Sequence, residues 1–307
     1  MNAIEVEHLS KKYGSLQALY DISFSVKQGE LFGFIGPDGA GKTTLFRLLT
    51  TLINPTSGSA RIDGYDIKKD YLSIRKCVGY MPGSFSLYQD LTVQENILFF
   101  ASIFGVSIEE NYELISPIYS QIEPFKNRRA GQLSGGMKQK LALSCALIHS
   151  PKVLFLDEPT TGVDAVSRSE FWDILSNLKS KQITVLVSTP YMDEASRCDR
   201  IALCNEGRIL SVDTPNGVVS RFKESLYAVK ANSMLALLNK VRTYEGIKAC
   251  YPFGEYHHMV VSEDFDNSKF YEQMKDIEGF VMKKIEPDIE DVFIKLMKDE
   301  RTHHNSE

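Results

Sequence analysis

The residues best suited to chemistry in this sequence form one short segment, Gly36-Pro37-Asp38-Gly39-Ala40-Gly41-Lys42-Thr43, which Thr44 follows. The segment matches the phosphate-loop pattern G-x-x-x-x-G-K-[ST] at every fixed position. In such a loop, backbone N–H groups surround phosphate oxygens, Lys42 would reach the outer phosphates, and Thr43 would bind Mg²⁺. The alternative is a chance match in a glycine-rich turn. The flanking residues oppose it, so the segment predicts a site for a nucleoside triphosphate.

The elements on either side of the loop can position it. Residues 30–35 are a short, mostly apolar run of the length expected for a buried strand. Residues 44–49 begin a helix, with apolar side chains at 45, 46, 48 and 49. A helix start carries roughly half a positive charge and unpaired N–H groups, which favours an anion. Strand, loop and helix together predict an anion-binding cradle.

A second segment places two carboxylates directly after four apolar residues, Val153 to Leu156. This pattern is typical of a buried parallel strand, and ligands bind at the carboxyl ends of such strands. Asp157 would bind the Mg²⁺ shell, and Glu158 would polarise the attacking water. The alternative is two solvated acids in a loop, which the phosphate loop upstream disfavours.

Two weaker features also suit a nucleotide. Tyr13 offers an aromatic face on which a purine could stack. Ordinary packing is the better explanation of a lone tyrosine, but its place ahead of the phosphate loop favours stacking. Ser134-Gly135-Gly136 opens a predicted helix with a hydroxyl and unpaired N–H groups, a second anion-binding geometry. Many helices begin with Ser-Gly, so this segment alone has little weight.

The remaining pattern indicates two domains. Ile4–Glu7 alternates apolar and acidic residues and predicts an edge strand, and Thr92 with Glu95 predicts a capping box before a helix over 97–121, interrupted at Gly105 and Pro117. After residue 221 the predicted order becomes β-α-β-β-α-β, which is typical of a ferredoxin-like domain. We therefore predict an α/β phosphate-loop domain over residues 1–220, and a small α+β domain over 221–307 that ends in a solvated tail from residue 301.

Composition narrows the class of protein. A net charge of −5, with Lys and Arg spread along the chain, argues against a nucleic-acid binder. The five cysteines show no C-x-x-C spacing, which favours free thiols in a reducing compartment. The first residues do not resemble a signal peptide, and no run of eighteen apolar residues occurs. We expect a cytoplasmic protein whose membrane association depends on a partner.

Taken together, residues 4–217 resemble the ATP-binding subunit of an ABC transporter. The resemblance implies that Tyr13 is the adenine-stacking aromatic, that residues 36–43 are the Walker A loop, and that residues 153–157 are the Walker B strand. It also implies that Glu158 is the catalytic base and that Asp164 belongs to the D-loop. The signature that would complete a partner's ATP site corresponds to Leu133-Ser134-Gly135-Gly136-Met137.

Two further segments, Tyr191–Ala195 and Glu290–Ile294, resemble the corresponding sequences of multidrug-type exporters whose permease is a separate chain. The resemblance implies ATP and Mg²⁺ as ligands, and a location on the inner face of the membrane through membrane-spanning permease subunits. The transported compound is recognised by the permease, so this sequence does not identify it.

Two positions depart from the family pattern. The family places a glutamine where this chain has Gly83, and a switch histidine where it has Pro190. Glycine has no side chain, and proline has neither an imidazole nor a backbone N–H. We do not expect Gln89, six residues after Gly83, to substitute.

These departures predict a chain that binds ATP·Mg²⁺ and hydrolyses it slowly at its own site. Its intact signature would complete the site of a second ATPase in a heterodimer, with a homodimer as the alternative. A different alternative is a regulatory or scaffolding ATPase that dimerises on nucleotide and transports nothing.

Overall fold

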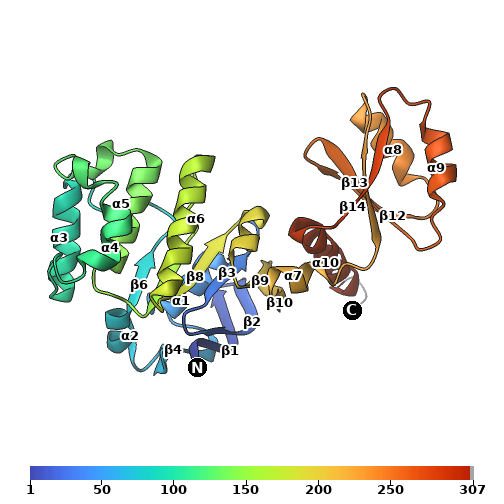
Figure 1. Ribbon diagram of the computed structural model, residues 1–307. Helices are drawn as coiled ribbons and strands as arrows, with labels where there is room; N and C mark the ends of the chain where they lie inside the picture. The colour runs from blue at the N-terminus through green and yellow to red at the C-terminus, as the bar shows by residue number, and fades with distance from the viewer. Residues whose placement is uncertain (305–307) are drawn as a thin grey trace. The chain divides into compact units, whose positions relative to one another are not determined.

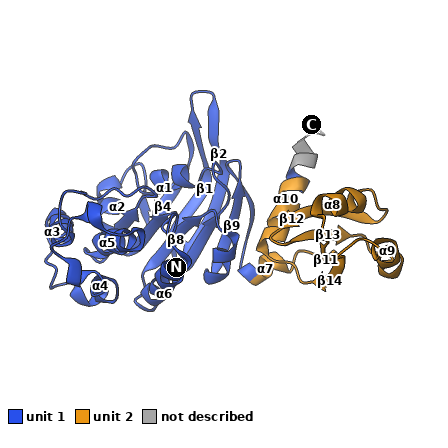
Figure 2. Cartoon of the chain, turned by 90° about the horizontal axis from the view of Figure 1, so that it is seen from above, with its two compact units in different colours: residues 1–215, 299–307 blue, residues 216–298 orange. Residues whose placement is uncertain are grey.

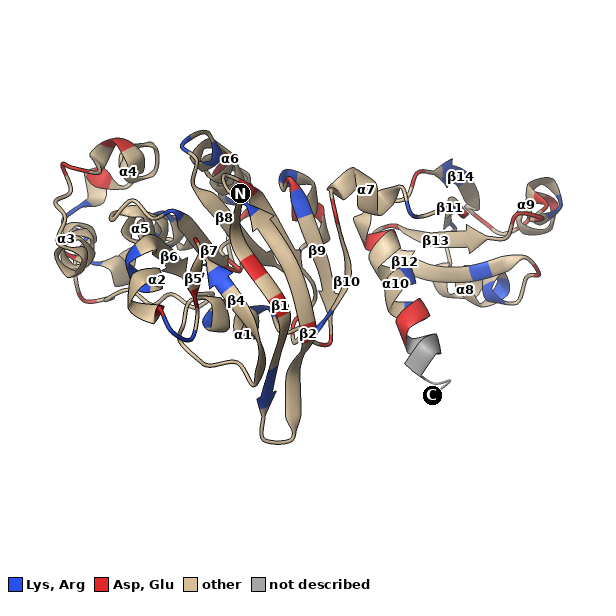
Figure 3. Ribbon diagram, turned by 90° about the horizontal axis from the view of Figure 1, so that it is seen from below, with Lys and Arg blue, Asp and Glu red and all other residues tan. Residues whose placement is uncertain are grey.

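The computed structural model describes residues 1–304; residues 305–307 lie outside the described part of the chain. The chain forms two compact units, residues 1–215 with the segment from residue 299 onward, and residues 216–298 (Figure 2). In both units, basic and acidic residues are interspersed along the chain (Figure 3). None of the described helices is both long enough and apolar enough to cross a membrane.

The first unit is built on a six-stranded sheet (Figure 1). Its strand order is β10-β9-β3-β8-β7-β6; the strands from β9 to β6 pair in parallel, and β10 is antiparallel to β9. The strands are β3 (Leu31–Ile35), β6 (Val78–Met81), β7 (Val153–Asp157), β8 (Thr184–Thr189), β9 (Arg200–Asn205) and β10 (Arg208–Asp213). Every residue of β3, β7 and β8 is buried, which confirms the predicted buried parallel strands.

A second sheet in this unit is antiparallel, with the order β2-β1-β4-β5. Its strands are β1 (Asn2–Tyr13), β2 (Leu16–Lys27), β4 (Ser57–Ile62) and β5 (Tyr65–Asp66). The prediction of an edge strand at Ile4–Glu7 is wrong, because β1 pairs with β2 on one side and β4 on the other. Phe24 of this sheet stacks on Phe32 of β3 with ring centroids 5.5 Å apart, so the two sheets share one core.

The helices of the first unit are α1 (Lys42–Leu49), α2 (Tyr71–Cys77), α3 (Val93–Phe104), α4 (Tyr112–Tyr119), α5 (Gly135–Leu147) and α6 (Ala165–Ser180). The capping box at Thr92 and Glu95 is confirmed, and α3 ends at Gly105. The predicted interruption at Pro117 is wrong, because this proline lies inside α4. The carbonyl of Glu113, which would pair with the missing N–H of Pro117, accepts a hydrogen bond from Lys181 Nζ at 2.8 Å instead.

The second unit has the predicted order of elements. After α7 (Pro215–Val219), which crosses the boundary between the units, come β11 (Ser225–Lys230), α8 (Met234–Arg242), β12 (Ile247–Phe253), β13 (Tyr256–Val261), α9 (Asn267–Met274), β14 (Val281–Ile285) and α10 (Ile289–His304). The sheet order β12-β13-β11-β14, antiparallel throughout, is that of a ferredoxin-like domain. α10 continues to His304, past residue 301, where a frayed and solvated tail is predicted, so this part of the tail is helical. Its solvation stays a prediction.

A buried polar cluster attaches the first turn of α10 to the sheet of the second unit. Asp291 accepts hydrogen bonds from Tyr251 OH at 2.8 Å and from His258 Nδ1 at 2.6 Å. Burial by itself raises the pKa of Asp291, but the hydrogen bonds from His258, Asp288 N–H and Tyr251 bring that pKa below its ordinary value. The ionised carboxylate is therefore the form that stabilises this unit.

We expect Asp291→Ala to lower the free energy of unfolding of the second unit by about 3 kcal/mol at neutral pH, because it breaks a buried pair. Since the native pKa is depressed, the stabilisation is present above about pH 3.9, the unfolded value, and is lost as pH falls through the native pKa. In an unfolding experiment, circular dichroism should show that the second unit unfolds under milder conditions. The fluorescence of Trp172, the only tryptophan, reports the first unit, and its unfolding transition should not change. An equal shift from the exposed Asp276→Ala would contradict this account.

Candidate nucleotide-binding site

The loop between β3 and α1 has a backbone that only glycine allows at two positions. Gly41 precedes α1 with φ +94°, a left-handed conformation that residues with a Cβ rarely adopt. A Cβ at Gly36 would lie 2.2 Å from the carbonyl oxygen of Cys204 on β9. The loop is thus pressed between α1 and the sheet, as a phosphate loop must be for its N–H groups to converge.

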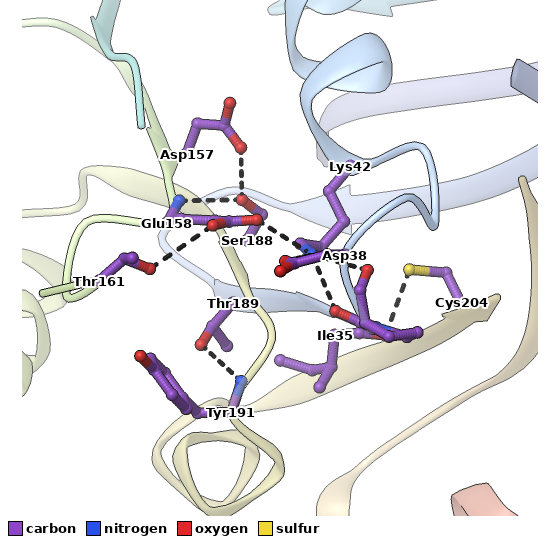
Figure 4. Close-up of polar contacts among 12 residues, drawn as sticks. Ile35, Asp38, Lys42, Asp157, Glu158, Thr161, Ser188, Thr189, Tyr191 and Cys204 are labelled. Atoms are coloured by element: carbon purple, nitrogen blue, oxygen red, sulfur yellow. Dashed lines mark hydrogen bonds and ion pairs between the residues drawn. The ribbon is translucent and has the colours of Figure 1, made fainter. Parts of the chain in front are cut away.

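Lys42 lies at the centre of this loop. Its side chain is 3% exposed, and Nζ donates to the carbonyls of Gly36 at 2.8 Å and Pro37 at 2.9 Å. The same ammonium lies 3.0 Å from Glu158 Oε1 (Figure 4). Asp38, in contrast, is 91% exposed. The lysine therefore joins the glycine loop to the carboxylate that follows β7.

Asp157 ends β7 inside the protein, with 1% of its surface exposed. Burial raises the pKa of Asp157, and hydrogen bonds from Ser188 and Thr43 oppose that shift. Ser188 Oγ donates to Asp157 Oδ1 at 2.7 Å. The structure thus brings Thr43 and Asp157, both predicted as Mg²⁺ ligands, into contact.

Tyr13 shares one cleft with Lys42, Thr43 and Glu158, whereas Asp157 does not line it. The cleft has a volume of about 680 Å³, and its lining includes Tyr13, Gly39, Gly41, Lys42, Thr43, Thr44 and Glu158. Tyr13 is 42% exposed, so its ring is available for stacking. Gly36, Pro37, Asp38 and Ala40 do not line the cleft.

Sequence reasoning missed several residues of this cleft. They are Leu16, Gln17, Ala18, Tyr20, Asn205, Glu206 and Arg208. They come from the β1–β2 and β9–β10 hairpins, which approach the loop through the hydrogen bonds Tyr20 N–H to Gly207 O at 2.8 Å and Gly207 N–H to Ala40 O at 3.2 Å. No local motif marks these residues as part of a nucleotide site, although the sequence around Asn205-Glu206-Gly207 is typical of a hairpin.

The predicted signature, residues 133–137, does not line this cleft. Ser134 caps α5 by accepting the N–H of Met137 at 3.4 Å, and Gly135 next to it is exposed. Leu133 is buried. Asp164 caps α6, accepting N–H groups of Val166 and Ser167 at 3.1 and 3.0 Å. Both helix starts are thus fixed away from the chain's own phosphate loop.

Of the two departing positions, Gly83 lies beside Asp157 and Glu158, and Pro190 lies directly after β8. A Cβ at Gly83 would be 3.1 Å from the carbonyl oxygen of Asp157 and 3.8 Å from Glu158 Cβ. Pro190 follows the end of β8, where the N–H of Tyr191 donates to Thr189 Oγ1 at 3.0 Å. Gln89 packs against Gly131. Within residues 1–304, no group of three or more His, Cys, Asp and Glu side chains forms a separate metal site.

Comparison with known proteins identifies the family. The ABC transporter family matches residues 19–161. The chain is 42% identical over 215 residues to the probable multidrug ABC transporter ATP-binding protein YbhF of Escherichia coli, covering 69% of this chain but only 37% of that one. It is 32% identical over 298 residues to the Nod factor export ATP-binding protein I of Rhizobium sp. (strain N33), covering 96% of each.

Solved structures of ATP-binding cassettes are also similar to this chain. An ATP-binding subunit of an ABC transporter is 29% identical with a TM-score of 0.66, covering 72% of this chain and 93% of that one. A dimeric ATP-binding cassette bound to ADP and phosphate is 26% identical with a TM-score of 0.62, covering 69% and 98%. The phosphate loop, the buried acid beside it and these relatives together show that the chain belongs to the ATP-binding subunits of ABC transporters.

Proposed function

We propose that this chain binds ATP·Mg²⁺ in the cleft of the phosphate loop and drives a permease that exports its substrate. The observation that carries the proposal is the contact of Lys42 Nζ with Glu158 Oε1 at 3.0 Å, beside the glycine loop. Export is supported by the printed names of the two relatives, a multidrug protein and a Nod factor export protein. The match covers only 37% of the first relative, so the activity of that whole protein supports no further assignment.

The residues present fit Mg²⁺. Thr43 and Asp157 bring a hydroxyl and a buried carboxylate into contact, and oxygen donors are what this hard cation requires. These two would hold the ion, which would neutralise charge on the phosphates. Glu158 would orient and deprotonate the attacking water, residues 36–44 would bind the phosphates, and Tyr13 would stack on adenine.

Gly83 and Pro190 make hydrolysis slow at this site. Neither residue offers a side-chain donor to the water or to the γ-phosphate, although Gly83 lies directly beside Asp157. A missing contact of this kind costs about a hundredfold in rate. ATP binding depends on the intact phosphate loop, so Gly83 and Pro190 do not weaken it.

The signature at residues 133–137 and the D-loop Asp164 face a second ATPase subunit. The dimeric structure of a similar cassette supports dimerisation of this chain. A chain that combines an intact signature with a weakened Walker site favours a heterodimer over a homodimer. Residues 1–220 form the ATPase domain and 221–307 an accessory domain. The assembly is peripheral on the cytoplasmic face of the membrane, held there by the permease; copurification with a membrane-spanning subunit distinguishes this from a scaffolding ATPase.

The Gly83→Gln and Pro190→His double variant tests the slow site. We expect its ATPase rate to rise about a hundredfold over the wild-type chain, with ATP affinity changed by less than about threefold. The Cβ of a residue at position 83 would lie 3.1 Å from the carbonyl oxygen of Asp157, so this carbonyl would have to move by a few tenths of an ångström. Pro117→His, at an exposed position of α4, serves as a control at another site. Rapid wild-type turnover that the double change leaves alone would refute the proposal.

A further inference from the structure

Glu158 has a backbone conformation that its surroundings must maintain. Its φ is +50°, in the left-handed region, which residues with a Cβ rarely adopt. Its N–H donates to Ser188 O at 3.1 Å and to Ser188 Oγ at 3.0 Å (Figure 4). The same hydroxyl donates to Asp157 Oδ1 at 2.7 Å. Ser188 therefore anchors the turn through Asp157 and the backbone N–H of Glu158.

A second anchor lies on the other side of Glu158. Glu194, in the short 3-10 helix Met192–Arg197, accepts a hydrogen bond from Thr160 Oγ1 at 2.9 Å. Its other carboxylate oxygen accepts one from Thr189 Oγ1 at 2.5 Å. The exposed fractions of Thr160, Thr189 and Glu194 are 2%, 0% and 4%. Glu194 thereby connects the end of β8 to the residue two positions after Glu158.

The charge at Glu194 is only partly balanced. The nearest cation is Arg168, whose Nε lies 3.8 Å from Glu194 Oε1 and whose guanidinium lies 4.9 Å from the centroid of the Tyr191 ring. Burying a carboxylate is costly unless hydrogen bonds and a counter-charge compensate it. An apolar side chain would fill the same volume without that cost, so a purpose other than stability is indicated.

We propose that Glu194 is a positioning residue for hydrolysis, which together with Ser188 fixes the turn at Glu158 and directs its carboxylate toward the phosphate loop. The proposal rests on the function proposed above for Glu158. The segment that carries Pro190 then acts on the reaction through Glu158, although Pro190 itself offers no phosphate contact.

The test compares variants that keep or remove the hydroxyl at Thr160. Thr160→Val and Glu194→Gln should lower the single-turnover rate at saturating ATP by about ten- to a hundredfold, because small displacements of a catalytic group cost that much. Their ATP dissociation constants should stay within about threefold of wild type, and Thr160→Ser should restore the rate. Glu272→Gln, on the exposed face of α9, is the matched control.

Hydrogen exchange provides a readout that needs neither ATP nor turnover. The amides of Glu158, Thr160 and Thr161 should exchange about tenfold faster in Thr160→Val and Glu194→Gln than in wild type or Thr160→Ser. Unchanged exchange and unchanged rates would overturn the inference, as would a loss of ATP affinity equal to the loss of rate. If the wild-type chain bound no ATP, the proposed function would fail, and exchange alone would still decide whether Glu194 anchors the turn.

Discussion

Lys42→Ala is expected to weaken ATP binding about a thousandfold, since the ammonium would make two charge-assisted hydrogen bonds to phosphates, each worth roughly 1.5–3 kcal/mol. The side chain is almost fully buried, and its contacts with Gly36 O, Pro37 O and Glu158 already place the ammonium within the loop. Titration calorimetry or fluorescent-nucleotide displacement measures the effect.

Lys152→Ala is the matched control, because Lys152 is 66% exposed and pairs with Asp63 at 2.6 Å outside the cleft. It should bind ATP like the wild-type chain. If Lys42→Ala bound ATP within about threefold of wild type, the phosphate loop would not be the nucleotide site, and the assignment of the whole cleft would be wrong.

Glu158→Gln is expected to lower hydrolysis about a thousandfold while ATP stays bound, because it removes the base and keeps the shape of the side chain. The amide can still lie near Lys42 and accept the hydrogen bond of Thr161. Phosphate release in a single-turnover experiment reports the rate, and equilibrium binding reports the affinity.

The Gly83→Gln and Pro190→His background increases the sensitivity of this experiment, because its starting rate is higher. Glu245→Gln, an exposed position in the second unit, should hydrolyse ATP at the parental rate. Hydrolysis that persisted in Glu158→Gln would show that another group activates the water.

Much of this architecture could be predicted because its causes are local. The glycine loop, the apolar run ending in Asp157 and the capping box at Thr92 each depend on a few consecutive residues. The order of elements after residue 221 likewise follows from short periodic segments, and the strand pairing agrees with it.

The errors arose where a distant residue changes the outcome. Pro117 remains inside α4 because Lys181 supplies a donor for the carbonyl of Glu113. The anchors of Glu158 are Ser188 and Glu194, thirty or more residues away, and no spacing rule links them to Thr160. No spacing rule placed the β1–β2 and β9–β10 hairpins beside the phosphate loop either, because the contacts that bring them there are also distant in sequence.

The proposed function requires that the chain binds ATP and hydrolyses it slowly. Both properties can be measured on the same wild-type sample with Mg²⁺ present, as ATP binding and as single-turnover hydrolysis. Our account predicts a dissociation constant in the micromolar range and a rate about a hundredfold below the roughly 10 per second of a typical enzyme. Absence of binding at millimolar ATP, or hydrolysis near 10 per second by this chain alone, would contradict it.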